Sequence, residues 1–100
     1  MRKTKWPTEV PVLEAKDIHK GSFDGPNGTH CLAGWRDMTF GSPEGQPWNV
    51  AYDAISSECG DLETMEFNDN EKTPKARIAR TWNRAMAKLG YVVGNPEAKS

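Results

Sequence analysis

The sequence has no long hydrophobic run, because its unbroken apolar stretches are only two or three residues long. A membrane-spanning helix needs about 20 consecutive apolar residues, and a signal peptide has an apolar core of about 7 to 15. The sequence therefore predicts neither a membrane span nor a secretory signal. We expect a cytoplasmic protein that does not contact membranes.

Cysteine is also scarce. Cys31 and Cys59 are the only two cysteines in 100 residues, and they belong to no larger cysteine framework. In a reducing cytoplasm such cysteines remain thiols. We expect both to be free, with a disulfide between them as the alternative.

Recognisable metal and phosphate motifs are missing. His19, His30, Cys31 and Cys59 are potential metal ligands, but no CxxC, HxxxH or HExxH spacing joins them. Zinc sites carry spacings of that kind. The chain also lacks GxGxxG, and no Gly is followed by Lys-Ser or Lys-Thr. The sequence thus predicts no metal, no phosphate-binding loop and no cofactor.

Cys31 is a candidate nucleophile because it stands at the start of a predicted helix, where a thiol pKa is lowered. Its neighbour His30 is poorly placed as a base, since adjacent side chains on a helix point about 100° apart. Free cysteine is also among the most buried residue types. We therefore expect Cys31 to face Trp35 and Met38 in the core, and the protein not to be an enzyme. A thiol enzyme using Cys31 is kept as an alternative.

The residues that are present indicate one small folded domain. A chain of 100 residues suffices for one core and is too short for two. Four tryptophans supply much of the buried area that a chain with only 36% hydrophobic residues needs. We expect a flexible arm over residues 1–9, one globular domain over 10–93 and a loose tail over 94–100.

Hydrophobic periodicity predicts a mainly α fold with three helices, near residues 30–40, 48–59 and 74–89. Threonine N-caps, a proline in the first turn and glycine stops frame these helices. The caps and stops are Thr29, Thr73, Pro74, Gly41, Gly60 and Gly90. The expected core consists of Leu32, Trp35, Met38, Trp48, Ile55, Phe67, Ile78, Trp82, Met86 and Leu89.

Two further segments complete the expected fold. The chain before the first helix should be short and extended over residues 10–13, and then form two helical turns over 14–20 that end at Gly21. Residues 61–70 should form an irregular loop that drops two or three side chains into the core. The overall prediction is a three-helix domain with a small N-terminal extended or helical segment.

Charge is segregated along the chain. Residues 37–71 hold nine acidic side chains and no Lys or Arg, whereas residues 72–88 hold six basic side chains and no Asp or Glu. Four of those bases fall within about 80° of the last predicted helix, on a separate side from its apolar residues. This basic face consists of Arg77, Arg80, Arg84 and Lys88.

The charge pattern has three interpretations. It can be an ordinary solvated helix face, partly neutralised by the acidic middle of the chain. The basic face can instead bind nucleic-acid phosphates, although the net charge of −1 and the absence of a nucleic-acid motif oppose this. Finally, acidic residues can offer a negative surface to a basic groove on a partner protein. That acidic surface would consist of Asp53, Glu58, Asp61, Glu63 and Glu66.

Asp69 and Glu71 lie directly before the last predicted helix. Acidic side chains at that place complement the positive end of the helix dipole. We expect these two residues to stabilise the start of the helix.

Several short motifs lie between residues 30 and 91. They are His30-Cys31-Leu32-Ala33-Gly34-Trp35, Phe67-Asn68-Asp69, Thr73, Arg84-Ala85-Met86 and Leu89-Gly90-Tyr91. They resemble an uncharacterised family of small bacterial and bacteriophage proteins, in which a C-L-x-G segment precedes an F-N-D turn and a final helix ending in an R-A pair. The resemblance implies a small helical domain and a phage origin, and it carries over no catalytic residue. Physically, Gly34 would permit close helix approach, Trp35 would fill the core and Asn68-Asp69 would make the turn.

Together these observations favour a small non-enzymatic binding protein. We expect a phage-encoded modulator or inhibitor of a host or defence protein that works by protein–protein contact. Nucleic-acid binding through the basic face is the first alternative, and thiol chemistry at Cys31 is the second.

Overall fold

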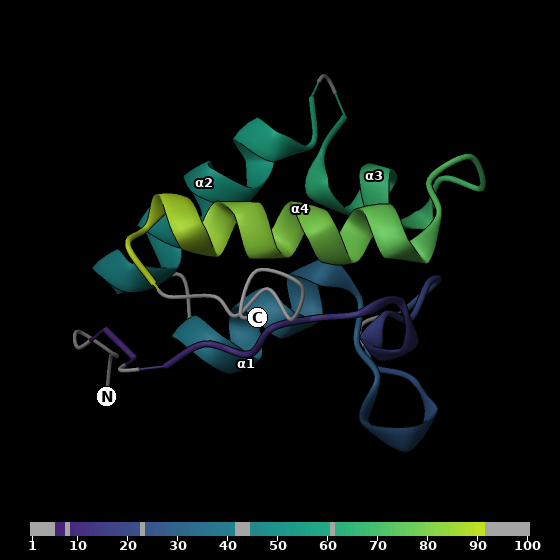
Figure 1. Ribbon diagram of the computed structural model, residues 1–100, viewed down its shortest axis with the longest axis horizontal. Coiled ribbons are helices and arrows are strands. Elements are labelled where there is room, and N and C mark those ends of the chain that lie inside the picture. Colours follow the sequence, from purple (N-terminus) through teal and green to yellow (C-terminus); the bar gives the residue numbers. More distant parts are fainter. Residues whose placement is uncertain (1–5, 8, 23, 42–44, 61, 92–100) are drawn as a thin grey trace, which may run out of the picture.

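The fold is mainly helical. A computed structural model describes residues 6–7, 9–22, 24–41, 45–60 and 62–91. Its α-helices are α1 (Leu32–Phe40), α2 (Gln46–Glu58), α3 (Thr64–Asp69) and α4 (Lys75–Lys88), and single 3-10 turns occur at Ala15–Asp17 and Pro26–Gly28. Figure 1 shows α4 across the front of the molecule, with α2 and α3 along one side of it and α1 along the other. The predicted mainly α, single-globule architecture is confirmed.

Each of the three expected helices is present, and their glycine stops are where the sequence predicts them. Gly41, Gly60 and Gly90 follow α1, α2 and α4 with φ of 89°, 72° and 95°. Such positive values favour glycine because it has no Cβ. In the part of the chain that the structure describes, no helix combines the length and apolar character needed to cross a membrane.

The two threonine caps are not where the sequence predicts them. The residue before α1 is Cys31, whose Sγ accepts the Gly34 N–H at 3.3 Å. Thr29 instead donates its hydroxyl to the Pro26 carbonyl at 2.8 Å. At the last helix Pro74 itself is the N-cap and α4 begins one residue later.

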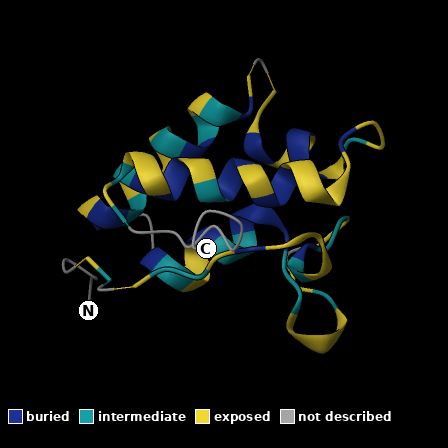
Figure 2. Cartoon of the chain, in the orientation of Figure 1, coloured by how far each residue is buried: buried dark blue, intermediate teal, exposed yellow. Residues whose placement is uncertain are grey.

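The core surrounds Trp82 of α4, which is completely buried. The buried side chains of this core cluster are Leu13, Ile18, Leu32, Phe40, Ala51, Ile55, Cys59, Phe67, Ile78, Ala79, Trp82, Ala85 and Met86. Six of the ten expected core residues belong to this set, and Trp35, Trp48 and Leu89 pack against it while partly buried. Figure 2 shows the buried positions of α4 turned toward the other helices.

Met38 was expected in the core and is 56% exposed, so that prediction is wrong. The reason is the phase of α1. The buried stripe follows Leu32, Arg36 and Phe40 at intervals of four residues, and it includes the charged Arg36, which apolar periodicity does not mark as buried. Phe40 therefore takes the core position, fully buried and 6.3 Å from the Trp82 ring.

The expected helix over residues 14–20 is reduced to one 3-10 turn at Ala15–Asp17. Backbone pairing with the segment before α1 ends it. The His19 N–H donates to the His30 carbonyl at 3.0 Å, and the His30 N–H donates to the Asp17 carbonyl at 3.2 Å. These bonds hold residues 17–19 beside His30, so the backbone cannot continue as a helix.

The N-terminal segment runs along α4 and is tied to it by side chains. Asn83 accepts the Leu13 N–H and donates to the Leu13 carbonyl, each at 3.0 Å. The Trp82 indole N–H donates to the Pro11 carbonyl at 2.9 Å. Residues 10–13 are outside any helix, consistent with the expected extended segment.

The segment over 61–70 contains α3, which the sequence analysis missed. The Glu66 carboxylate accepts the Glu63 backbone N–H at 3.4 Å at the start of this helix. Phe67 and Asn68 point inward and are buried. Since an isolated helix of six residues is unstable in water, these tertiary contacts are what hold α3 in place.

Candidate binding surfaces

The basic face of α4 is fully presented to solvent. Arg77, Arg80, Arg84 and Lys88 are all exposed, whereas Ile78, Ala79, Trp82, Ala85 and Met86 of the same helix are buried. Figure 2 shows exposed positions recurring along the side of α4 that is turned to the viewer. The helix thus separates charge from core as its periodicity requires.

The four basic side chains differ in what they contact. Lys88 Nζ lies 2.8 Å from Glu58 Oε2 and 3.0 Å from Ser57 Oγ on α2. The Arg77 guanidinium carbon lies 5.5 Å from the centre of the Phe67 ring on α3. Arg80 and Arg84 have no ion pair or hydrogen bond to any residue that the structure describes.

The predicted acidic surface is not one continuous patch among the described residues. Glu58 faces α4, where Lys88 neutralises it. Asp53 is exposed on α2 at about 140° from Glu58 around the helix axis. Glu63 and Glu66 lie exposed at the start of α3, and Asp61 is outside the described residues. Among the described residues, the acidic middle of the chain therefore neutralises only the Lys88 end of the basic face.

The start of α3 forms a separate surface, which we call the α3 patch: Leu62, Glu63, Met65 and Glu66. Leu62 is 37% and Met65 50% exposed, although both were candidates to enter the core from an irregular loop. The helical turn explains the difference, because it directs Thr64, Phe67 and Asn68 inward instead. Neither carboxylate of the patch forms an ion pair within the described part of the chain.

Asn68 and Asp69 act as connectors rather than as a turn. Asn68 is fully buried, and its side chain bonds the Leu32 N–H at 2.9 Å and the His19 carbonyl at 3.1 Å. The Asp69 carboxylate accepts the Gly21 N–H at 2.9 Å. Asp69 therefore binds the N-terminal segment, and the expected stabilisation of the start of α4 by Asp69 and Glu71 stays a prediction.

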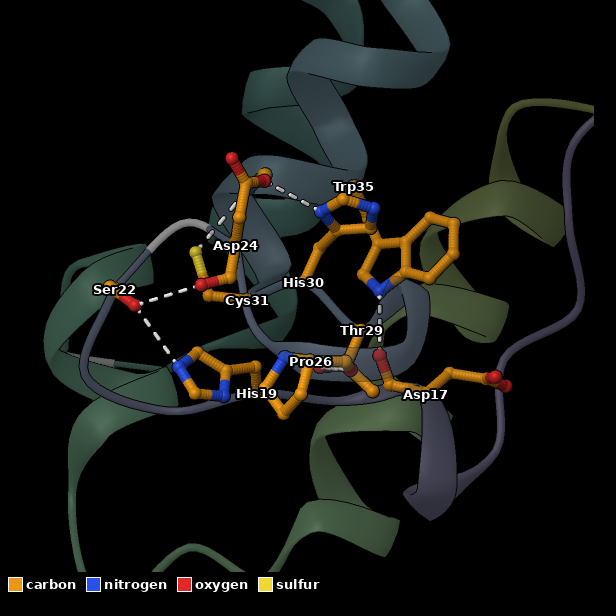
Figure 3. Close-up of polar contacts among 10 residues, drawn as sticks. Asp17, His19, Ser22, Asp24, Pro26, Thr29, His30, Cys31 and Trp35 are labelled. Atoms are coloured by element: carbon orange, nitrogen blue, oxygen red, sulfur yellow. Dashed lines mark hydrogen bonds and ion pairs between the residues drawn. The ribbon is translucent and has the colours of Figure 1, made fainter.

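His30, in the loop before α1, meets Trp35 of that helix (Figure 3). His30 Nδ1 lies 2.8 Å from the Asp24 carboxylate, and the His30 ring packs edge-on against Trp35 with centroids 4.7 Å apart. His19 Nε2 lies 3.0 Å from Ser22 Oγ. Because the Ser22 hydroxyl donates to the Asp24 carbonyl, its proton is already committed to the backbone. These contacts fix the loop.

Both thiols are buried and free. Burial raises the pKa of Cys31 above its ordinary value, against the opposing effect of N–H groups from Gly34 and Ala33. Burial also raises the pKa of Cys59 to about 11. Neither thiol has the lowered pKa that a nucleophilic cysteine requires. Among the described residues, no three His, Cys, Asp or Glu side chains converge as metal ligands.

A cluster between α1 and α2 was not identified from the sequence. The buried Arg36 guanidinium carbon lies 4.6 Å from the Trp48 ring centre and 5.4 Å from that of Tyr52. Asp37 accepts the Trp48 indole N–H at 2.6 Å and the Arg36 Nε–H at 3.1 Å. The aromatic spacing of four residues on α2 is visible in the sequence, but the partner on α1 depends on how the helices pack. The cluster joins the two helices.

The chain has no match among protein-family models, curated protein sequences or solved structures. The resemblance over residues 30–91 to the small bacterial and phage family therefore stays a prediction. The geometry of the surfaces carries the functional argument.

Proposed function

We propose that this is a small non-enzymatic protein that binds another protein through the basic face of α4. The observation that carries the proposal is the pair Arg80 and Arg84, both exposed and without an acidic partner in the described part of the chain. A guanidinium binds carboxylates through two parallel hydrogen bonds. An acidic surface on a partner protein would supply those carboxylates.

The dimensions of the basic face favour a protein over nucleic acid. Arg77 and Arg84 are seven positions apart, which corresponds to about 10 Å of helix. Glu58 bounds the positive region at the C-terminal end of α4, and Arg77 at the other end contacts α3, whose first turn carries exposed carboxylates. A phosphate backbone extending past the Lys88 end would meet the negative charge of Glu58, whereas a compact acidic cluster would not.

Nucleic acid is the second candidate, because the same unpaired guanidiniums can contact phosphates. Its signature is an affinity that falls steeply with salt and is lost on charge reversal of Arg80 and Arg84. A gel shift with duplex and single-stranded probes measures both properties. Absent or salt-insensitive shifts would remove this candidate.

The resemblance in residues 30–91 extends the proposal to a biological setting. A phage-encoded protein of this size that binds without catalysis would act as a modulator or inhibitor of a host or defence protein in the host cytoplasm. This setting makes a bacterial lysate the appropriate source of partners.

The test is affinity capture from bacterial lysate with the wild-type chain, the R80E/R84E variant and a control. The control, K16E/K72E, changes net charge equally at two exposed positions away from the basic face. We expect wild type and control to retain the same stoichiometric protein and R80E/R84E to lose it. Equal retention by R80E/R84E would overturn the proposal, as would specific recovery of RNA or DNA without a protein.

A further inference from the structure

We propose that the α3 patch is a second docking site and that it takes a basic amphipathic helix from a partner protein. The proposal goes beyond the function assigned to the basic face of α4 and does not depend on it. It rests on three properties of the patch: exposed apolar side chains, a rigid support, and carboxylates that form no ion pair in the described part of the chain.

The apolar part consists of Leu62 and Met65, which are 37% and 50% exposed and lie three residues apart. Neither side chain belongs to the core, which α3 reaches through Phe67. Leu62 directly precedes the N-cap of α3 and Met65 is in its first turn, so two large exposed apolar side chains occur within four residues of the chain. Met is also well suited to contact partners, because its unbranched side chain adapts to the surface it meets.

The support is rigid although α3 is short. Asn68 fastens the helix to α1 and to the segment before it, through Leu32 and His19. Phe67 is 2% exposed and packs between the core and Arg77. Since the patch is held in place before any partner arrives, binding loses little conformational entropy there.

The charged part consists of Glu63 and Glu66, both exposed and without an ion pair in the described part of the chain. One oxygen of Glu66 accepts the Glu63 N–H, which orients that carboxylate. A partner must therefore present apolar side chains flanked by Lys or Arg. A basic amphipathic helix does so on one face and is a common ligand of apolar surfaces on proteins.

The same chemistry argues against the other occupants. A nucleic acid would be repelled by the two carboxylates. A second copy of the chain has the basic face of α4 to offer, but the exposed apolar residues within α4 itself are Ala76 and Ala87. Alanine is too small to cover Leu62 and Met65, so a partner with larger apolar side chains fits better.

The experiment titrates the full-length protein with a synthetic amphipathic helix of about 18 residues made of leucine and lysine. Amide chemical shifts locate the peptide, and fluorescence anisotropy gives its dissociation constant. We expect the shifts to centre on residues 62–66. Replacing both apolar side chains (L62S/M65S) should weaken binding about tenfold or more, and E63Q/E66Q should weaken it severalfold at low salt.

Matched controls decide specificity. M38S changes an equally exposed methionine on α1, and D53N removes an exposed carboxylate from α2. Both variants, and R80E/R84E, should bind the peptide within about twofold of wild type. The side chain introduced by E66Q keeps an oxygen that can accept the Glu63 N–H. The E63Q/E66Q variant therefore still tests the proposal if L62S/M65S does not fold.

Three results would overturn the proposal: peptide-induced shifts centred elsewhere, equal loss of binding in M38S, or no binding at millimolar peptide. Light scattering adds a fourth, since dimerisation through residues 62–66 would identify a second copy as the occupant. Loss of lysate capture by R80E/R84E tests the basic face separately, so the two proposals can fail independently.

Discussion

The side-chain oxygen of Asn68 accepts the backbone N–H of Leu32 at 2.9 Å, across 36 residues of sequence. This N–H belongs to the first turn of α1, where no backbone carbonyl of the helix can accept it. Asn68, a residue of α3, thus gives a hydrogen-bond partner to a backbone N–H at the start of α1. It is also completely buried, so its bonds are shielded from water.

Replacing Asn68 with Ala should destabilise the protein strongly. The change leaves the Leu32 N–H and the His19 carbonyl without their partner, and each buried unsatisfied group costs about 1–3 kcal/mol. We expect the free energy of unfolding, measured in urea, to fall by about 2–4 kcal/mol. The control is N70A, which removes only a bond to the Lys72 N–H near the surface and should cost about 1 kcal/mol or less. Equal losses in the two variants would contradict this role for Asn68.

Gly25 should tolerate no side chain. A Cβ at this position would overlap the His19 imidazole and the Thr29 hydroxyl. We expect G25A to lower the free energy of unfolding by about 1–3 kcal/mol, the usual effect of overpacking. Removing the obstructing ring should cancel part of this loss. The free energy of unfolding of G25A/H19A should therefore be closer to that of H19A than the sum of the two single effects predicts. Simple additivity in this cycle would show that His19 is not the obstruction.

The helices that the sequence predicts best are those with enough turns to define a period. The 14 residues of α4 display a complete apolar stripe, and its exposed basic positions follow from the same periodicity. The six residues of α3 are too few for that, so Leu62 and Met65 could not be placed on its exposed side. In α1 the buried stripe runs through Arg36, a charged residue that apolar periodicity does not mark as buried, so the sequence pattern pointed to Met38 instead.

Contacts between elements were beyond the reach of the sequence for a different reason. Lys88 and Glu58 carry opposite charges, but their pairing requires α2 and α4 to lie side by side. The Arg77 contact with Phe67 likewise requires α3, which was not expected. Periodicity assigns a residue to a face of its own helix, and tertiary packing decides what that face meets.

The Lys88–Glu58 ion pair should contribute little to stability. The Lys88 side chain is 52% exposed and Glu58 16%, so solvent and salt screen much of their attraction. A double-mutant cycle with K88Q and E58Q should give a coupling energy of about 0.2–1 kcal/mol that shrinks in high salt. By contrast, I55A removes a fully buried side chain of α2, the helix that carries Glu58, and should lower the free energy of unfolding by about 2–5 kcal/mol. A coupling energy as large as the I55A effect would show that the ion pair holds α2 on α4.

The buried thiols should make the protein less stable in alkali. Burial raises the pKa of Cys59 from 9.0 to about 11, so the folded protein keeps a proton that the unfolded chain loses. Stability from this source is complete below about pH 9 and is lost as the pH rises toward about 11. We expect C59A to reduce the slope of unfolding free energy against pH in that window. An unchanged slope would assign the effect to Cys31 and Tyr91, whose pKa values burial also raises.

The bonds between α4 and the first segment of the chain also set the order in which the protein can fold. Trp82 bonds Pro11, Asn83 bonds Leu13, and Tyr91 bonds the Pro7 carbonyl across 84 residues. Trp82, at the centre of the core, thus follows α1, α2 and α3 in the chain. A growing chain can form α1 and α2 early, but it cannot bury them until α4 has left the ribosome. Folding of this domain is therefore completed only when its last helix becomes available.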